Sequence, residues 1–102
     1  MTIEKKIDGE TIVLVPNDKI SSNSAIELEK EVVQALDEYK EVIIDFTNIP
    51  YMSSAGLRVL LLGQKKAKAN NASLKLKNVP DLINDVLEAT GFLDFIEICD
   101  NE

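Results

Sequence analysis

Histidine is absent from this 102-residue chain, and cysteine occurs once, at Cys99. Without histidine, the chain cannot carry Ser-His-Asp or Cys-His nucleophile chemistry, nor a zinc site with histidine ligands. A single cysteine forms neither an internal disulfide nor a cysteine-based metal site. We therefore expect no metal and no cofactor, and we expect Cys99 to be a small, half-buried apolar residue and not a reactive thiol.

Long apolar segments and an excess of positive charge are missing as well. No apolar run approaches the ~20 residues that a membrane helix requires, and the first residues lack the apolar core of a signal peptide. Eleven Lys and Arg against eighteen Asp and Glu give a formal net charge of -7 and a pI near 4.5. We therefore expect a cytoplasmic protein that binds neither nucleic acid nor an anionic membrane.

The remaining composition is typical of one folded domain. Apolar residues make up 45% of the chain and charged residues 28%, which is ordinary for a globular protein and unlike a disordered one. A chain of this length forms one modest hydrophobic core but not two. Residues 1–102 are therefore expected to be a single domain.

The N-terminal residues have the pattern of a β-hairpin. Thr2–Ile7 and Thr11–Val15 are strand-like runs, and Asp8-Gly9 between them is a strong signal for a two-residue turn. The segment 16–18 begins with proline and is expected to end the second strand. The hairpin adds antiparallel pairing to whatever sheet follows.

A long amphipathic helix is predicted next. The segment 21–24 reads Ser-Ser-Asn-Ser and offers several possible N-caps. Apolar residues then recur at helical spacing, while acidic and other polar residues fill the opposite face. The apolar stripe, which we expect to cover one side of a sheet, consists of Ala25, Leu28, Val32, Ala35, Leu36 and Tyr39.

A strand and a second helix follow. Glu41–Phe46 is almost continuously apolar, which is typical of a central strand covered on both faces. The second helix is expected to run from near Ser54 to about Ala69, with Asn70-Asn71 at its end. Its segment Leu57–Leu62 is apolar on all sides of the helix. Either that helix is covered on two sides, or part of it is an exposed patch for a partner.

In the last third of the chain, a strand is again followed by a helix. Ser73–Lys77 predicts a half-exposed strand near the sheet edge. Pro80 suits the first turn of a third helix, whose apolar residues are Leu82, Ile83, Val86 and Leu87, and Gly91 suits its end. A final group is expected to be buried in a short strand or a docking helix: Phe92, Leu93, Phe95, Ile96 and Ile98.

This order of elements predicts a small α/β domain with a mixed sheet of four to five strands and helices packed on it. Loops that lead from strands into helices should gather at one end of the sheet, so the serines of segments 21–24 and 53–54 should converge. Serines at a helix start suit a cap, a bound anion or a covalent phosphate. The residues by themselves favour the cap at both places.

Residues 43–61, IIDFTNIPYMSSAGLRVLL, resemble the signature of bacterial anti-sigma factor antagonists of the STAS domain family. The resemblance extends to element order, length and acidic charge, and it implies the STAS fold. It also implies that Ser54 is the phosphorylated serine, with Ser53 as the alternative acceptor. The residues expected to meet the partner are Ser21, Ser22, Asn23, Ser53, Ser54, Gly56, Leu57 and Arg58.

The resemblance also implies a mechanism. The unphosphorylated form is expected to bind an anti-sigma factor that is also a serine kinase and so to free a sigma factor. Phosphorylation then ends the interaction, and a PP2C-type phosphatase resets it. The alternative is a STAS interaction module of a transporter or stress-sensing complex, in which Ser54 is only a cap. An enzyme is not expected, because Asp45 is the one carboxylate placed near the site.

Two positions depart from the commonest pattern of the family. Many members have Asp immediately before the phosphorylated serine, where this chain has Ser53, and an acidic residue before the first helix, where Ser21 falls. Hydroxyl groups thus replace two carboxylates near the site.

Overall fold

The computed structural model describes residues 1–99; residues 100–102, at the end of the predicted domain, lie outside the described part. A five-stranded mixed sheet has the order β1-β2-β3-β4-β5, with β1 antiparallel to β2 and the other pairs parallel. This confirms the predicted α/β class. The strands are β1 Thr2–Asp8, β2 Thr11–Asn17, β3 Glu41–Asp45, β4 Ser73–Lys77 and β5 Glu97–Ile98, and the helices are α1 Ser22–Glu38, α2 Ser54–Ala69, α3 Asp81–Ala89 and the 3-10 turn η1 Phe92–Asp94.

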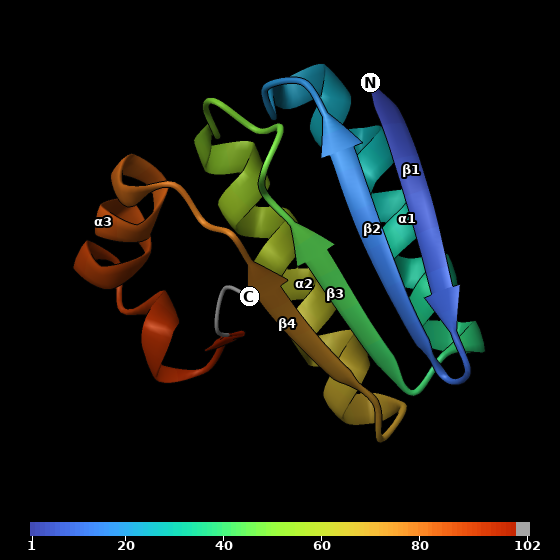
Figure 1. Ribbon diagram of the computed structural model, residues 1–102. Helices are drawn as coiled ribbons and strands as arrows, with labels where there is room; N and C mark the ends of the chain where they lie inside the picture. The colour runs from blue at the N-terminus through green and yellow to red at the C-terminus, as the bar shows by residue number, and fades with distance from the viewer. Residues whose placement is uncertain (100–102) are drawn as a thin grey trace.

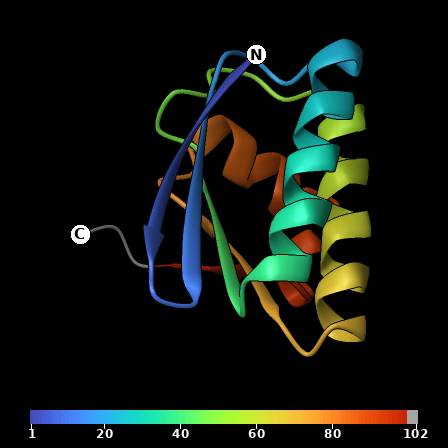
Figure 2. The same ribbon diagram turned by 90° about the vertical axis from the view of Figure 1, so that its right-hand side faces the viewer.

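The helices α1 and α2 lie side by side on one face of the sheet, and no helix of residues 1–99 covers the opposite face (Figures 1 and 2). The expectation that β3 is covered on both faces is therefore wrong, and Ile43 is half-buried between Val13 and Lys75 of the neighbouring strands. The reason is topological. Parallel crossovers are right-handed, and the strand order runs in one direction, so successive helices fall on the same face.

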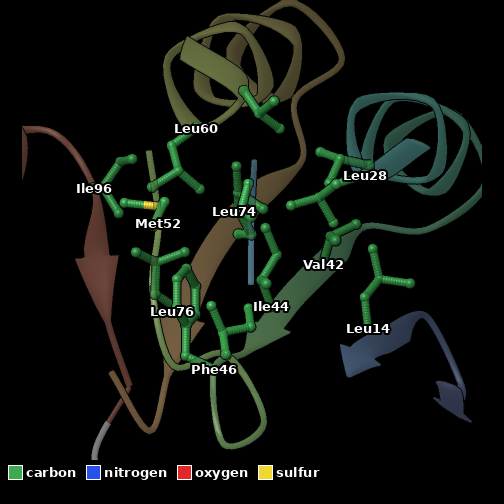
Figure 3. Packing of buried hydrophobic residues seen from close by; sticks show 14 of the residues in the cluster. Leu14, Leu28, Val42, Ile44, Phe46, Met52, Leu60, Leu74, Leu76 and Ile96 are labelled. Carbon is green, nitrogen blue, oxygen red and sulfur yellow. The ribbon is translucent and has the colours of Figure 1, made fainter. Parts of the chain in front are cut away.

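The core fills the layer between this face of the sheet and the two helices (Figure 3). Alternate strand residues point into it, as the period of two requires, and none of those named here exceeds 2% exposure: Leu14, Val42, Ile44, Leu74 and Leu76. The predicted stripe of α1 meets them, although Tyr39 at its end is only half-buried. Within residues 1–99, no helix has the length and apolarity to cross a membrane.

The hairpin differs from its prediction in two details. Asp8 pairs with Thr11, so the two loop residues are Gly9 and Glu10, and Gly9 supplies the positive φ of 63° that the turn needs. The second strand continues through Pro16 to Asn17, beyond its predicted end. Since β2 pairs with β3 only as far as Leu14, it is an edge strand at Pro16, where a sheet tolerates proline.

The second helix has the predicted bounds, Ser54–Ala69, and is covered on two sides. It packs against α1 on one side and meets the C-terminal segment on the other, where Gln64 Nε2 donates to the carbonyl of Phe95 at 2.7 Å. Val59 and Leu60 are buried, whereas Leu61 and Leu62 remain half-exposed. The two-sided cover thus accounts for most of the apolar run.

The predicted apolar stripe of α3 is buried only in part. Ile83 and Leu87 join the core, but Leu82 is 66% exposed and Val86 39%. In Figure 1, α3 lies outside the sheet at the margin of the domain, so only the side of the helix that carries Ile83 and Leu87 meets the core. The chain then forms η1 and the short β5, and Ile96 is buried.

Cys99 is half-buried at the end of β5, and its backbone N–H donates to the carbonyl of Leu76 at 2.7 Å. Burial is the main cause that raises the pKa of the Cys99 thiol. A protonated, partly covered thiol fits the predicted apolar role.

Asp45 ends β3 as an 8% exposed carboxylate on the side of the sheet away from α2. Its Oδ1 accepts hydrogen bonds from Thr47 N at 2.9 Å, Thr47 Oγ1 at 2.6 Å and Asn78 Nδ2 at 3.0 Å. Burial by itself raises the pKa of Asp45, but these bonds and the charge of Lys77 outweigh it and hold the pKa below its ordinary 3.8. The carboxylate therefore joins the end of β3 to the loop after β4.

Replacing Asp45 by Asn tests this role. We expect the free energy of unfolding at neutral pH to fall by about 2 kcal/mol, because the donors of Thr47 and Asn78 lose a charged acceptor. The pKa of Asp45 is lower in the folded than in the unfolded chain. The stabilisation that its carboxylate contributes is therefore present above pH 3.8 and is lost as the pH falls through the folded pKa. In urea denaturation, the difference in the free energy of unfolding between wild type and Asp45→Asn should therefore disappear in strong acid. The control is Asp85→Asn at an exposed position. A difference in the free energy of unfolding between wild type and Asp45→Asn that does not change with pH contradicts the prediction.

Candidate functional site

Two loops, β2–α1 and β3–α2, lie side by side at the carboxyl ends of their strands (Figure 1). Ile20 N–H donates to the carbonyl of Tyr51 at 2.9 Å, and Ser53 N–H donates to the carbonyl of Ile20 at 2.9 Å. An isolated parallel bridge pairs Ile20 with Met52. The predicted convergence of the two serine-containing segments is therefore confirmed.

In the first loop, Ser21 and Ser24 form a capping box that begins α1. Ser24 N–H donates to Ser21 Oγ at 3.4 Å, and Ser21 N–H donates to Ser24 Oγ at 2.8 Å. Ser24 Oγ also donates to the carbonyl of Lys19 at 2.9 Å and is nearly buried. Ser22 and Asn23 are exposed, so they are the members of this segment that a partner can reach.

In the second loop, the two adjacent serines take different positions. Ser53 is the N-cap of α2, and its half-buried Oγ accepts a hydrogen bond from Ala55 N–H at 3.2 Å. Ser54 is the first residue of the helix and is exposed. Within residues 1–99, its hydroxyl forms no hydrogen bond to another protein group. The cap and the accessible hydroxyl are thus two different residues.

Gly56 holds the start of α2 against the two loops. It is buried, and a Cβ at this position would overlap the side chain of Met52 and lie 3.1 Å from Ile20 Cγ2. Leu57 beside it is half-buried and packs against the core. Of the predicted partner-binding residues, these two position the helix start, while Ser54 and Arg58 are exposed.

A shallow groove of about 500 Å³ runs between the first turns of α1 and α2. Its lining is Ser22, Ala25, Ile26, Glu29, Lys30, Ala55, Arg58 and Val59. Ile26 is 60% exposed at the groove, and Tyr51 is 54% exposed on the β3–α2 loop. Sequence reasoning missed both, because Ile26 lies off the apolar stripe of α1 and a lone loop tyrosine carries no pattern.

The charge around the site is more positive than the net charge of the chain suggests. Two helix N-termini meet here, and neither α1 nor α2 has an acidic residue in its first turn. Ser21 and Ser53 are both N-caps, so uncharged hydroxyls begin the two helices. Asp45, at the end of β3, accepts hydrogen bonds from Thr47 and Asn78. The described residues contain no cluster of acidic or cysteine side chains that could hold a metal.

The sequence matches known proteins of one family. The STAS domain model matches residues 2–102. BtrV of Bordetella bronchiseptica, named as an anti-sigma factor antagonist, is 32% identical over 97 residues, covering 94% of this chain and 83% of BtrV. The anti-sigma-B factor antagonist of Bacillus subtilis is 30% identical over 80 residues, covering 78% of this chain and 73% of that protein.

Solved structures match the fold. SpoIIAA in its unphosphorylated form has a TM-score of 0.78 at 16% identity, over 97% of this chain and 88% of that one, and the phosphorylated Bacillus protein has 0.76 at 15%, over 97% and 92%. A sulfate transporter family protein from Wolinella succinogenes has 0.74 at 21%, over 88% and 74%. At these identities the likeness concerns the fold alone. With the family model spanning nearly the whole sequence, this chain belongs to the STAS domain family.

Proposed function

We propose that this chain is an anti-sigma factor antagonist that is switched by phosphorylation of Ser54. In the cytoplasm, its unphosphorylated form binds an anti-sigma factor that is also a serine kinase and so releases a sigma factor. Phosphorylation of Ser54 ends the interaction, and a PP2C-type phosphatase restores it. The observation that carries the proposal is that Ser53 caps α2 while the neighbouring Ser54 is exposed at the helix start.

The names of the relatives support the role as an anti-sigma factor antagonist. BtrV and the Bacillus subtilis protein are both named as anti-sigma factor antagonists. SpoIIAA, which shares the fold, has been solved in unphosphorylated and phosphorylated forms. The assignment of the phosphate to Ser54 rests on this chain's own geometry and on the position of this serine two residues before Gly56.

The proposed docking surface is the end of the domain where α1 and α2 begin. Ser22, Asn23, Ser54 and Arg58 offer exposed polar groups there, and Ile26 adds an exposed apolar side chain beside the groove. Interfaces of this kind combine an apolar centre with a polar rim. Ser54 directly precedes Ala55 of the groove lining, so we expect a partner that covers the groove to cover the hydroxyl of Ser54 as well.

A phosphate on Ser54 is tolerated by the fold but not by such an interface. It adds roughly -1.5 to -2 charges at neutral pH, beside a helix N-terminus that stabilises them. The backbone therefore has no reason to rearrange. In the complex, by contrast, the dianion is buried against the partner, and a loss of about 3 kcal/mol there weakens binding about a hundredfold.

We propose a binding role and not an enzymatic one. The sequence has no histidine, and the carboxylate of Asp45 is committed to hydrogen bonds that hold the fold. The second candidate is an interaction module of a transporter or stress-sensing complex, favoured by the structural likeness to the Wolinella succinogenes protein. In that case Ser54 has no regulatory role, so phosphate mapping separates the two.

The first prediction concerns the modified residue. In chain purified from its own host, the tryptic peptide of residues 41–58 should carry phosphate on Ser54, as located by tandem mass spectrometry. Ser54→Ala should abolish it. Ser53→Ala should keep the phosphate but lower the free energy of unfolding by about 1 kcal/mol, because a helix cap is lost. Peptide that carries phosphate on neither serine, under every growth condition tested, contradicts the proposal.

The second prediction concerns the partner. Ser54→Asp should weaken binding to the host's anti-sigma factor kinase at least tenfold in calorimetry, equivalent to about 1.4 kcal/mol, while Ser54→Ala should bind like wild type. The control is Gln34→Glu, which adds the same charge at an exposed position of α1 outside the groove. Equal weakening by Gln34→Glu would assign the effect to net charge and refute a local switch.

A further inference from the structure

Arg58 stands one helical turn beyond Ser54 on α2, and both side chains are exposed. Residues four apart are neighbours on a helix surface, with Cβ atoms ~5–6 Å apart. At 3.6 residues per turn they differ by only about 40° around the axis. A guanidinium at Arg58 is therefore within reach of any group attached to the Ser54 hydroxyl.

The charge of Arg58 is not committed elsewhere in the described part of the chain. Lys5, Lys66 and Lys75 each form an ion pair with a carboxylate, whereas Arg58 forms none. Glu29 lines the same groove, yet it makes no ion pair with Arg58. Moving the guanidinium toward Ser54 therefore breaks no existing ion pair.

The surroundings favour an anion on the Ser54 side of Arg58. The first turns of α1 and α2 lack acidic residues, and Lys30 lines the groove with Arg58. A guanidinium can bind phosphate oxygens through two parallel hydrogen bonds, which a lysine cannot. Arg58 is thus the side chain on this surface that best matches a phosphate in both position and geometry.

We propose that Arg58 is the intramolecular counter-ion of phosphorylated Ser54 and leaves the rim of the α1–α2 groove to bind the phosphate. This rests on the proposed phosphorylation of Ser54 and adds a second element to the switch. The phosphate weakens docking because its charge has to be buried, and it also removes a cationic side chain from the docking groove. The modification therefore changes both the charge and the lining of one surface without moving the backbone.

The test uses full-length chain with phosphoserine installed at position 54 during synthesis, so that no kinase is needed. Phosphorus NMR then follows the second ionisation of the phosphate, whose pKa is about 6 in an unpaired phosphoserine. We expect the midpoint in wild type to lie below that of an unstructured phosphopeptide. Arg58→Gln should raise it by about half a pH unit, and Arg58→Lys by less.

The matched control is Lys65→Gln, which removes one exposed positive charge from the same helix about three turns away. It should leave the midpoint almost unchanged. If Arg58→Gln moves the midpoint no more than Lys65→Gln does, the proposed pair does not form. If the host never phosphorylates Ser54, the proposed function fails, while the NMR comparison still decides whether this surface pairs a phosphate with Arg58.

Discussion

Two backbone hydrogen bonds centred on Ile20 hold together the end of the domain that carries the candidate site. The N–H of Ile20 donates to Tyr51 and its carbonyl accepts from Ser53, so the loop before α1 is fixed to the loop before α2. Because Ile20 and Met52 are also buried, the same contact anchors both loops in the core. The starts of two helices are thereby brought together, and the groove, the two caps and the exposed Ser54 all depend on that arrangement.

The same arrangement explains how one short segment can stabilise the fold and remain available to a partner. Ser53 satisfies a backbone donor at the start of α2, and buried Gly56 lets the helix approach Met52 closely. Ser54, between them, has no part in either contact. A modification there changes the surface charge without removing a cap or a packing contact, which is the property that a reversible switch requires.

The electrostatics of this end differ from those of the chain as a whole. The net charge is -7, yet the site combines two helix N-termini with two cations, Arg58 and Lys30, against the carboxylate of Glu29. The hydroxyls of Ser21 and Ser53 cap these helices without adding negative charge. In the proposed function, an added phosphate is therefore favourable within the domain, and its free-energy cost arises only when a partner covers it.

The sequence by itself determined the order of elements, the bounds of α2 and the convergence of the serine segments, because periodicity, caps and the direction of parallel strands are local or topological rules. It could not decide which serine is exposed, since either can cap a helix. It predicted cover on both faces of β3, because an apolar run does not show on which faces of the sheet the helices lie. The hydrogen bonds of Asp45 were not predictable either, because Asn78 comes from the loop after β4. Only the tertiary structure joined Ile26, Lys30 and Arg58 into one groove, since these residues come from two helices that meet through packing.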